Sequence, residues 1–237
     1  MKFPIAILAG GLATRMKPLT ETIPKALLDV AGKPFVVHQL ELLRQHGFEE
    51  VVLCVGHLGE QVEAALGNGS RWGLKLSYAF DGPKLLGTGG ALRCALPLLG
   101  DSFFVLYGDS YLMCDYAAIQ QAFLNQGKSG LMTVFHNTGL WDRSNILFQN
   151  DEILCYDKQH PTADMQHIDY GLGVFKAQVF EDYEPNQSFD LAGVYQGLLK
   201  KKNLAAFEVT QRFYEIGSHE GLRETHMYLT QKKESDA

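Results

Sequence analysis

The 237-residue sequence has few cysteines, no run of more than three basic residues and no long apolar segment. Its four cysteines are widely spaced and form no CxxC pair, so we expect reduced core thiols instead of a zinc ribbon or a disulfide framework. The apolar stretch near the start ends at Gly10, which is too short for a signal peptide or a membrane span. We therefore expect a cytoplasmic protein with no membrane partner.

The charged and catalytic residue types exclude further classes. The formal net charge is −6, and lysines cluster only at 200–202 and 232–233, so the sequence does not predict a nucleic-acid partner. The eight histidines form no HExxH motif and no zinc-type quartet with the cysteines, and Gly-x-Ser-x-Gly does not occur. Neither a zinc enzyme nor a serine hydrolase is predicted.

Apolar segments rich in β-branched residues alternate with amphipathic ones in the first half of the chain. This alternation is typical of βαβ units, and it predicts an α/β fold: a Rossmann-like three-layer α/β/α sandwich around a mostly parallel, mixed sheet. The expected strands are Ile5–Ala9, Val51–Val55, Leu74–Phe80 and Phe103–Tyr107. The expected helices are Phe35–Gln45 and Glu60–Leu66, and the glycines at 47 and 67 are placed to end them.

The pattern becomes more mixed after Asp115. No linker, low-complexity segment or internal repeat interrupts the chain. We expect one domain over residues 1–237, with a nucleotide-binding half to about residue 115 and an acceptor half from about residue 116. The second half is expected to contain helices Ala117–Gln126, Leu191–Lys201 and one beginning at Glu220, and strands Leu131–Phe135, Ile146–Phe148, Leu172–Phe175 and Ala205–Val209.

The segment from Leu8 to Lys25 is the most informative. A buried strand ends at Gly10 and Gly11, whose missing side chains let backbone N–H groups approach a phosphate. The loop then supplies a hydroxyl and three cations. A glycine pair by itself is also an ordinary tight turn, but the combined composition is that of a triphosphate cradle.

Asp109 stands at the carboxyl end of the expected strand Phe103–Tyr107. Ligands of open α/β sheets bind at that edge, and Mg²⁺ prefers one or two carboxylates together with phosphate oxygens. An aspartate in this place can equally cap the next segment. The residues alone leave both interpretations open.

The spacing Gly-Gly-x-x-Thr-Arg-x-x-Pro-Leu-Thr, followed by Ile-Pro-Lys, resembles the signature of the sugar-phosphate nucleotidyltransferase family. The resemblance runs in order from Ile5 to about Tyr228, and it is strongest to heptose 1-phosphate guanylyltransferases and N-acetylmuramate 1-phosphate uridylyltransferases. It implies an enzyme that uses Mg²⁺, or Mn²⁺, to transfer a nucleoside monophosphate from an NTP to a sugar 1-phosphate. The products would be pyrophosphate and an NDP-sugar for cell-envelope glycan precursors.

The resemblance also implies residue roles. Arg15 and Lys25 would be catalytic, with Lys25 on the α-phosphate, and the metal would bind Asp109 and Glu215. The acceptor would contact Gly108, Asp157, Lys158, Asp169 and Gly171. The nucleotide would contact Leu8, Ala9, Gly10, Gly11, Thr14, Arg15, Lys25, Gly87, Thr88 and Gly89.

The sequence departs from the family pattern at Ala13, which replaces a glycine, at Glu215, which replaces an aspartate, and at Asp157, which replaces a glutamate; Asp169-Tyr170-Gly171 also stands where many members have Asn-Ala-Gly. Two alternatives stay open: a cytidylyltransferase acting on a phosphate such as phosphocholine, and an inactive nucleotide-binding regulator, which the first three substitutions suggest. A relaxed P-loop pattern ending at Ser129 lacks the preceding strand and following helix that this motif requires. The sequence leaves the nucleobase, the sugar and the oligomeric state open.

Overall fold

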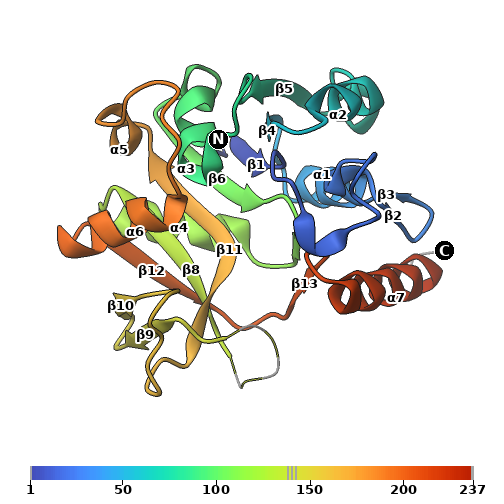
Figure 1. The fold of residues 1–237 in the computed structure, drawn as a ribbon. Coiled ribbons are helices and arrows are strands. Elements are labelled where there is room, and N and C mark those ends of the chain that lie inside the picture. Colours follow the sequence, from blue (N-terminus) through green and yellow to red (C-terminus); the bar gives the residue numbers. More distant parts are fainter. Residues whose placement is uncertain (1, 138, 140, 142, 236–237) are drawn as a thin grey trace.

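The computed structural model describes residues 2–137, 139, 141 and 143–235. Its centre is a nine-stranded sheet (Figure 1). Four strands from the first half lie side by side in the order β6-β1-β4-β5, and all their pairings are parallel. They are β1 (Ile5–Leu8), β4 (Glu50–Val55), β5 (Lys75–Phe80) and β6 (Ser102–Tyr107).

The second half of the chain extends the same sheet through mostly antiparallel pairings. β11 (His167–Lys176) pairs antiparallel with β6 and with β8 (Gly130–His136). β12 (Leu204–Val209) is parallel to β8, and the hairpin of β9 (Ile146–Gln149) and β10 (Glu152–Tyr156) joins the start of β11. The pairing of β11 with β8 shifts between Asp169 and Gly173, so this strand bulges beside the site described below.

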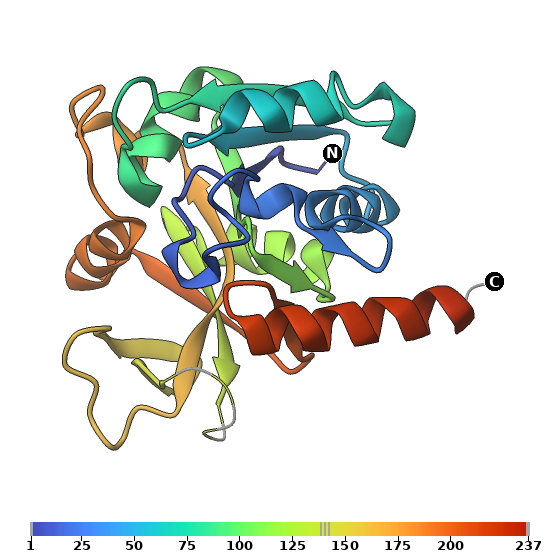
Figure 2. The same ribbon diagram turned by 45° about the vertical axis from the view of Figure 1, so that its right-hand side comes forward.

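Helices cover both faces of the sheet, because successive strand residues point to opposite sides. Ile5 and Ile7 of β1 pack with α1 (Phe35–Gln45), α2 (Gly59–Leu66) and α4 (Tyr116–Gln126). Ala6 packs on the other face with α3 (Gly87–Ala95), α5 (Gln178–Glu181) and α6 (Leu191–Lys200). Figure 2 shows the layers from a second direction. The predicted three-layer α/β/α sandwich is confirmed.

A smaller unit closes one side of the molecule. β7 (Ser110–Leu112) pairs with β13 (Phe213–Glu215), β2 (Asp29–Val30) pairs with β3 (Lys33–Pro34), and α7 (His219–Ser235) packs beside both pairs (Figure 1). Ile216 and Leu229 are buried in the cluster that joins them. The β7–β13 pair therefore brings the end of the chain next to the loop after β6.

Each strand and helix expected from the sequence is present, with bounds that differ by a few residues. β11 begins at His167 instead of Leu172, because a polar, bulged segment around Asp169 interrupts its apolar pattern. Sequence analysis missed β10, whose pattern is broken by exposed residues and a bulge. It also missed α5 and the short pairs, which have too few residues for a recognisable period. Within the described residues, no helix is both long enough and apolar enough to cross a membrane.

Candidate active site

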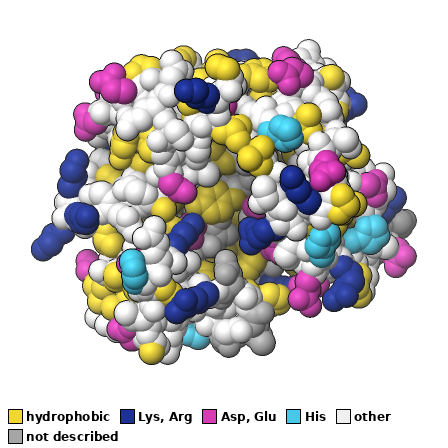
Figure 3. All heavy atoms as spheres, in the orientation of Figure 1, with side chains coloured by type: hydrophobic (Ala, Val, Ile, Leu, Met, Phe, Trp, Pro, Cys, Tyr) yellow, Lys and Arg dark blue, Asp and Glu magenta, His cyan; other side chains and the backbone are white. Residues whose placement is uncertain are grey.

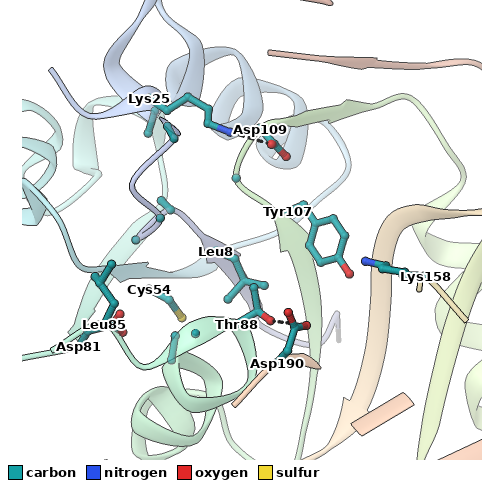
Figure 4. Close-up of a pocket in the computed structure, with 18 residues that line it drawn as sticks. Leu8, Lys25, Cys54, Asp81, Leu85, Thr88, Tyr107, Asp109, Lys158 and Asp190 are labelled. Carbon is teal, nitrogen blue, oxygen red and sulfur yellow. Dashed lines mark hydrogen bonds and ion pairs between the residues drawn. The ribbon is translucent and has the colours of Figure 1, made fainter. Parts of the chain in front are cut away.

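A first cavity of about 340 Å³ lies at the carboxyl ends of the parallel strands (Figure 4). Its walls come from the loop after β1, the start of α3 and the segment after β6. The second half of the chain also contributes, through Lys158 and Asp190. The predicted site residues that line it are Leu8, Ala9, Gly10, Gly11, Lys25, Gly87, Thr88, Gly108, Asp109 and Lys158.

Close backbone packing explains two of the glycines in this wall. A Cβ on Gly10 would lie 2.9 Å from the backbone nitrogen of Gly56, in the loop after β4. A Cβ on Gly108 would overlap the carbonyl oxygen of Leu8. A Cβ on Gly11, in contrast, would enter open space. The segments that follow β1, β4 and β6 therefore pack closely against one another below the cavity. Gly11 leaves the cavity side of its loop free of a side chain.

Ala13 adopts the left-handed conformation, with φ 49° and ψ 42°. The Thr20 hydroxyl donates to the Ala13 carbonyl oxygen at 3.0 Å and fixes this turn. The left-handed region costs an L-residue about 1–2 kcal/mol, whereas glycine enters it freely. This conformation explains why the family that the sequence resembles usually has glycine at this position. In this chain the backbone of Ala13 is strained.

Replacement of Ala13 by glycine is expected to raise the free energy of unfolding slightly. The released strain exceeds the roughly 0.4–1 kcal/mol that glycine's greater freedom in the unfolded chain costs. Ala122→Gly, in the middle of α4, is the matched control and should lower stability by about 1 kcal/mol. Chemical denaturation of both variants measures the difference. Equal destabilisation by the two substitutions would contradict the strain assigned to Ala13.

Lys25 and Asp109 form an ion pair at the edge of the first cavity. Their Nζ and Oδ2 atoms are 2.9 Å apart, and their side chains are 20% and 28% exposed (Figure 4). The short helix Lys25–Leu27 presents the lysine, and the carboxylate follows β6 directly. Residues far apart in the sequence thus place a cation and an anion where phosphates can reach both.

A second cavity of about 610 Å³ adjoins the first. Tyr107, Asp109 and Lys158 line both cavities. Figure 3 shows a hollow near the middle of this face with Lys and Arg side chains beside it. The predicted site residues that line the second cavity are Arg15, Asp109, Lys158, Asp169, Gly171 and Glu215.

Glu215 is brought to Asp109 by the pairing of β13 with β7. Its Oε2 accepts from the Gly217 N–H, and its Oε1 accepts from the Ser218 hydroxyl at 2.6 Å. A Cβ placed on Gly217 would lie 2.8 Å from Glu215 Oε2, 3.0 Å from Asp109 Oδ2 and 3.4 Å from Arg15 Nη2. Two carboxylates and a guanidinium therefore converge on one glycine.

The extra methylene of Glu215, relative to aspartate, is accommodated by Gly221. A Cβ on Gly221, in the first turn of α7, would overlap Glu215 Oε1. Ser218 caps the same helix, since its Oγ accepts from the Gly221 N–H at 2.9 Å. The carboxylate therefore folds back under the amino end of α7, in space that only a glycine leaves.

Tyr107 connects the two cavities to the bulge in β11. Its hydroxyl donates to Asp169 Oδ2 at 2.6 Å, and the Gly171 N–H donates to Asp169 Oδ1 at 3.0 Å. Burial raises the pKa of Tyr107 well above its ordinary value, so the hydroxyl stays protonated. Lys158 Nζ lies 6.0 Å from the centre of the Tyr107 ring. Asp169 is thus fixed at the wall of the second cavity.

Among the described site residues, Thr14, Gly89 and Asp157 line neither cavity. The Gly89 N–H donates to the Phe189 carbonyl at 3.0 Å. Asp157 Oδ1 accepts from the N–H groups of residues 159 and 160, which lowers the pKa of this carboxyl. The roles expected of these three residues stay predictions.

Sequence analysis missed several residues of the two cavities. Asp81 follows β5 just as Asp109 follows β6, so the rule that identified Asp109 applies to it equally. Asp190 caps α6 and accepts from the Thr88 hydroxyl at 3.1 Å. Arg212 stacks on Trp141 and Tyr214 in the second cavity, a contact that no sequence pattern indicates.

The comparisons with known proteins agree with this geometry. The family model described as "Nucleotidyl transferase" matches residues 5–139. The chain belongs to the nucleotidyl transferase family. The matched segment contains the Gly10–Lys25 loop, α3 and Asp109. The family that the sequence resembles is thereby confirmed.

Several relatives are named as sugar 1-phosphate nucleotidyltransferases. The chain is 32% identical over 218 residues to N-acetylmuramate alpha-1-phosphate uridylyltransferase of Neisseria meningitidis, covering 90% of this chain and 92% of that one. Identity to UTP--glucose-1-phosphate uridylyltransferase of Synechocystis is 29% over 225 residues, covering 87% of this chain but 58% of the relative. Identity to D-glycero-alpha-D-manno-heptose 1-phosphate guanylyltransferase of Campylobacter jejuni is 27% over 212 residues, covering 89% and 93%.

A solved structure shares the fold. A putative glucose-1-phosphate thymidylyltransferase from Bacillus anthracis, in complex with a sucrose, has a TM-score of 0.84 and 22% identity. The match covers 96% of this chain and 95% of the other. The mixed sheet and its helical layers are therefore those of a known nucleotidyltransferase structure.

Proposed function

We propose that the chain transfers a nucleoside monophosphate from an NTP to a sugar 1-phosphate, releasing pyrophosphate and an NDP-sugar. One observation carries this proposal: two adjoining cavities share Asp109 and Lys158, and the Lys25–Asp109 ion pair stands between them. A two-substrate phosphoryl transfer needs such an arrangement, because donor and acceptor must meet at one phosphorus. The names of the relatives support the same reaction.

The first cavity suits the NTP. Its glycine-rich floor leaves backbone groups accessible beside Gly11, and Lys25 lies at the end where the phosphates would sit. Arg15 lies beside the two carboxylates and can pair with phosphate oxygens on the other side. The nucleoside would then extend toward Gly87 and Thr88 at the start of α3.

Asp109 and Glu215 fit a bound Mg²⁺. Both carboxylates converge on Gly217, and Mg²⁺ is commonly held in proteins by one or two carboxylates plus substrate phosphates and water. When bound, the ion would neutralise phosphate charge and orient the phosphate oxygens. Mn²⁺ has the same preference for oxygen ligands.

The second cavity suits the sugar 1-phosphate. Lys158 stands where it can hold the acceptor phosphate, and Asp169 offers a carboxylate to sugar hydroxyls. An oxygen of that phosphate attacks the α-phosphorus in line, a new P–O bond forms, and the bond to pyrophosphate breaks. The attacking phosphate is already ionised near neutral pH, so no protein base is required. Lys25 leaves Asp109 and stabilises the negative charge at the reacting phosphorus.

Phosphocholine is a less suitable acceptor for this cavity. A quaternary ammonium group binds best on open aromatic faces. The rings of Trp141 and Tyr214 are the aromatic faces beside Arg212, and its guanidinium carbon lies 4.0 Å and 4.5 Å from their centres. Arg212 also pairs with Glu224. The protein's own cation therefore covers two of the aromatic rings that line this cavity.

A matrix of nucleoside triphosphates against sugar 1-phosphates and phosphocholine, read by pyrophosphate release, tests the proposal. We expect release with at least one sugar 1-phosphate, dependent on Mg²⁺ or Mn²⁺, and none with phosphocholine. Release with phosphocholine alone would favour the cytidylyltransferase alternative. Nucleotide binding without release in any combination would favour an inactive regulatory protein.

Gly221→Ala is expected to displace the Glu215 carboxylate and to weaken Mn²⁺ binding in the NTP complex by roughly 10- to 100-fold, as loss of groups that orient metal ligands does. The shorter aspartate should relieve the overlap, so Glu215→Asp should restore affinity in the Gly221→Ala background. Gly193→Ala, in the first turn of α6, is the control, because its Cβ would meet no atom within 4 Å. Electron paramagnetic resonance of Mn²⁺ measures the affinities. Unchanged affinity in Gly221→Ala would contradict the proposed ligand position.

A further inference from the structure

We propose that Gln39 is a positioning residue for Asp109. Its side-chain amide holds the two backbone carbonyl groups on either side of Gly108 and Asp109, and so fixes the direction of the Asp109 carboxylate. The inference rests on the proposed function, in which Asp109 is a metal ligand. Gln39 lies on α1 and lines neither of the two cavities described, so it acts through the backbone and touches no substrate.

The chain turns at Gly108 and Asp109 as it passes from the main sheet to the smaller unit. β6 ends at Tyr107, and β7 begins at Ser110. The Asp109 carbonyl oxygen accepts from the Ile216 N–H at 2.9 Å, which fixes the turn on the side of β13. Figure 4 shows the Asp109 side chain leaving this segment toward Lys25. The conformation of the turn therefore decides where the carboxylate points.

Gln39 joins the two ends of this turn. Its Nε2 donates to the carbonyl oxygen of Tyr107 at 3.3 Å and to that of Ser110 at 2.8 Å. An amide nitrogen carries two hydrogens, so one side chain can hold two carbonyl groups. Because both partners are acceptors, the nitrogen of the amide and not its oxygen must face them. Gln39 thus closes the turn on the side of α1.

The burial of Gln39 needs an explanation, which these two hydrogen bonds supply. The residue is 1% exposed and lies among apolar residues of α1. Burial of an amide is unfavourable unless hydrogen bonds replace those to water. Its Oε1 has no hydrogen-bond partner among the described residues, so the two donated bonds compensate the burial. A leucine or a methionine would fill similar space without this cost.

The same helix also supports Lys25. The Phe35 N–H, at the start of α1, donates to the Leu28 carbonyl oxygen at 2.9 Å, directly after the short helix that presents the lysine. Ala26 of that short helix is buried in one cluster with apolar residues of α1. α1 therefore lies behind both members of the Lys25–Asp109 ion pair.

The test is the variant Gln39→Met, which keeps the length of the side chain and removes both donors. Mn²⁺ affinity of the NTP complex, measured by electron paramagnetic resonance, should fall roughly 10- to 100-fold, as it does when groups that orient metal ligands are lost. NTP affinity without a divalent ion should stay within about twofold, because the glycine loop and α3 do not share contacts with Gln39. A purely structural Gln39 would lower both affinities together.

Tyr116→Phe is the matched control. Tyr116 is fully buried, and its hydroxyl donates to the carbonyl oxygen of Leu112 in β7 at 3.0 Å. The substitution thus removes a buried hydrogen bond to the strand that follows Asp109 without altering the turn itself. We expect wild-type Mn²⁺ affinity in this variant. An equal loss of affinity in Tyr116→Phe and Gln39→Met would overturn the specific role of Gln39.

A double variant tests whether Gln39 acts through Asp109. In the Asp109→Asn background, Gln39→Met should weaken Mn²⁺ binding much less than it does in the wild type, because the ligand that it positions is already lost. The same loss in both backgrounds would overturn the proposal. Gln39→Asn carries its donors on a side chain one methylene shorter, and it gives the same comparison should the methionine variant not fold.

The outcomes separate this inference from the proposed function. If Asp109→Asn weakens Mn²⁺ binding and neither Gln39 variant does, the role of Gln39 is overturned and the proposed function stands. If the wild type binds no Mn²⁺ with any NTP, the metal site of the proposed function and the role of Gln39 fail together.

Discussion

Replacement of Lys25 by alanine is expected to lower turnover by at least about 100-fold, the cost of removing one oriented donor that stabilises transition-state charge. The lysine lines the first cavity, where it is held by its 2.9 Å pair with Asp109, a residue that lines both cavities. Its free ammonium group is needed most when charge develops at the α-phosphorus. The effect should therefore appear in kcat, measured by steady-state pyrophosphate release, more than in the KM for the nucleotide.

The matched control for this variant is Lys33→Ala. Lys33 also pairs with a carboxylate, that of Glu41, but it lines neither of the two cavities described. We expect turnover of the control to stay within about twofold of the wild type, as surface ion pairs contribute little. Near-normal turnover of Lys25→Ala would remove this residue from the catalytic site.

Asp109→Asn is expected to reduce turnover by about 100-fold or more, because charge stabilisation by a catalytic metal is worth several kcal/mol. The amide keeps the shape of the side chain but loses the charge that both the cation of Lys25 and a divalent metal require. Mn²⁺ affinity of the NTP complex should fall together with turnover. An unchanged free energy of unfolding, measured by chemical denaturation, would distinguish a lost metal ligand from a general loss of structure.

Asp101→Asn is the control for this second prediction. Asp101 immediately precedes β6, and Asp109 follows its carboxyl end, so the two aspartates lie at opposite ends of one strand. We expect the control to retain wild-type turnover and metal affinity. In the double variant Lys25→Ala with Asp109→Asn, the loss should be smaller than the product of the single losses, because the residues contact each other. If the loss of turnover in the double variant equalled the product of the two single losses, the joint action of Lys25 and Asp109 would be contradicted.

The parallel half of the fold was predictable because its strands are buried on both faces. Their continuous apolar runs and the glycines that end α1 and α2 mark each element in the sequence. The hairpin of β9 and β10 was harder, because β10 carries exposed residues and a bulge. β7 and β13 were missed since each has only three residues, too few for a recognisable period.

The residues of the candidate site likewise fall into two groups: those that a local sequence pattern indicates, and those that only the structure identifies. Lys25 and Asp109 could be found because a glycine-rich loop and a strand end each carry a local pattern. Asp81 satisfied the same strand-end rule but lacked a family motif, so burial in the structure was needed to single it out. Tyr107 was predicted as strand core, yet its hydroxyl reaches Asp169 across the pairing of β6 with β11. Contacts of this kind depend on tertiary structure and leave no local pattern.

The most direct test of the central claim is product analysis after incubation of the full chain with each of the four common NTPs, Mg²⁺ and a panel of sugar 1-phosphates. If the two cavities bind donor and acceptor as proposed, mass spectrometry will detect an NDP-sugar with at least one pair of substrates, and pyrophosphate will be released in equal amount. Pyrophosphate should not form when the sugar 1-phosphate is omitted. The absence of any nucleotide-sugar product with all four common NTPs, while the nucleotide still binds, would contradict the account.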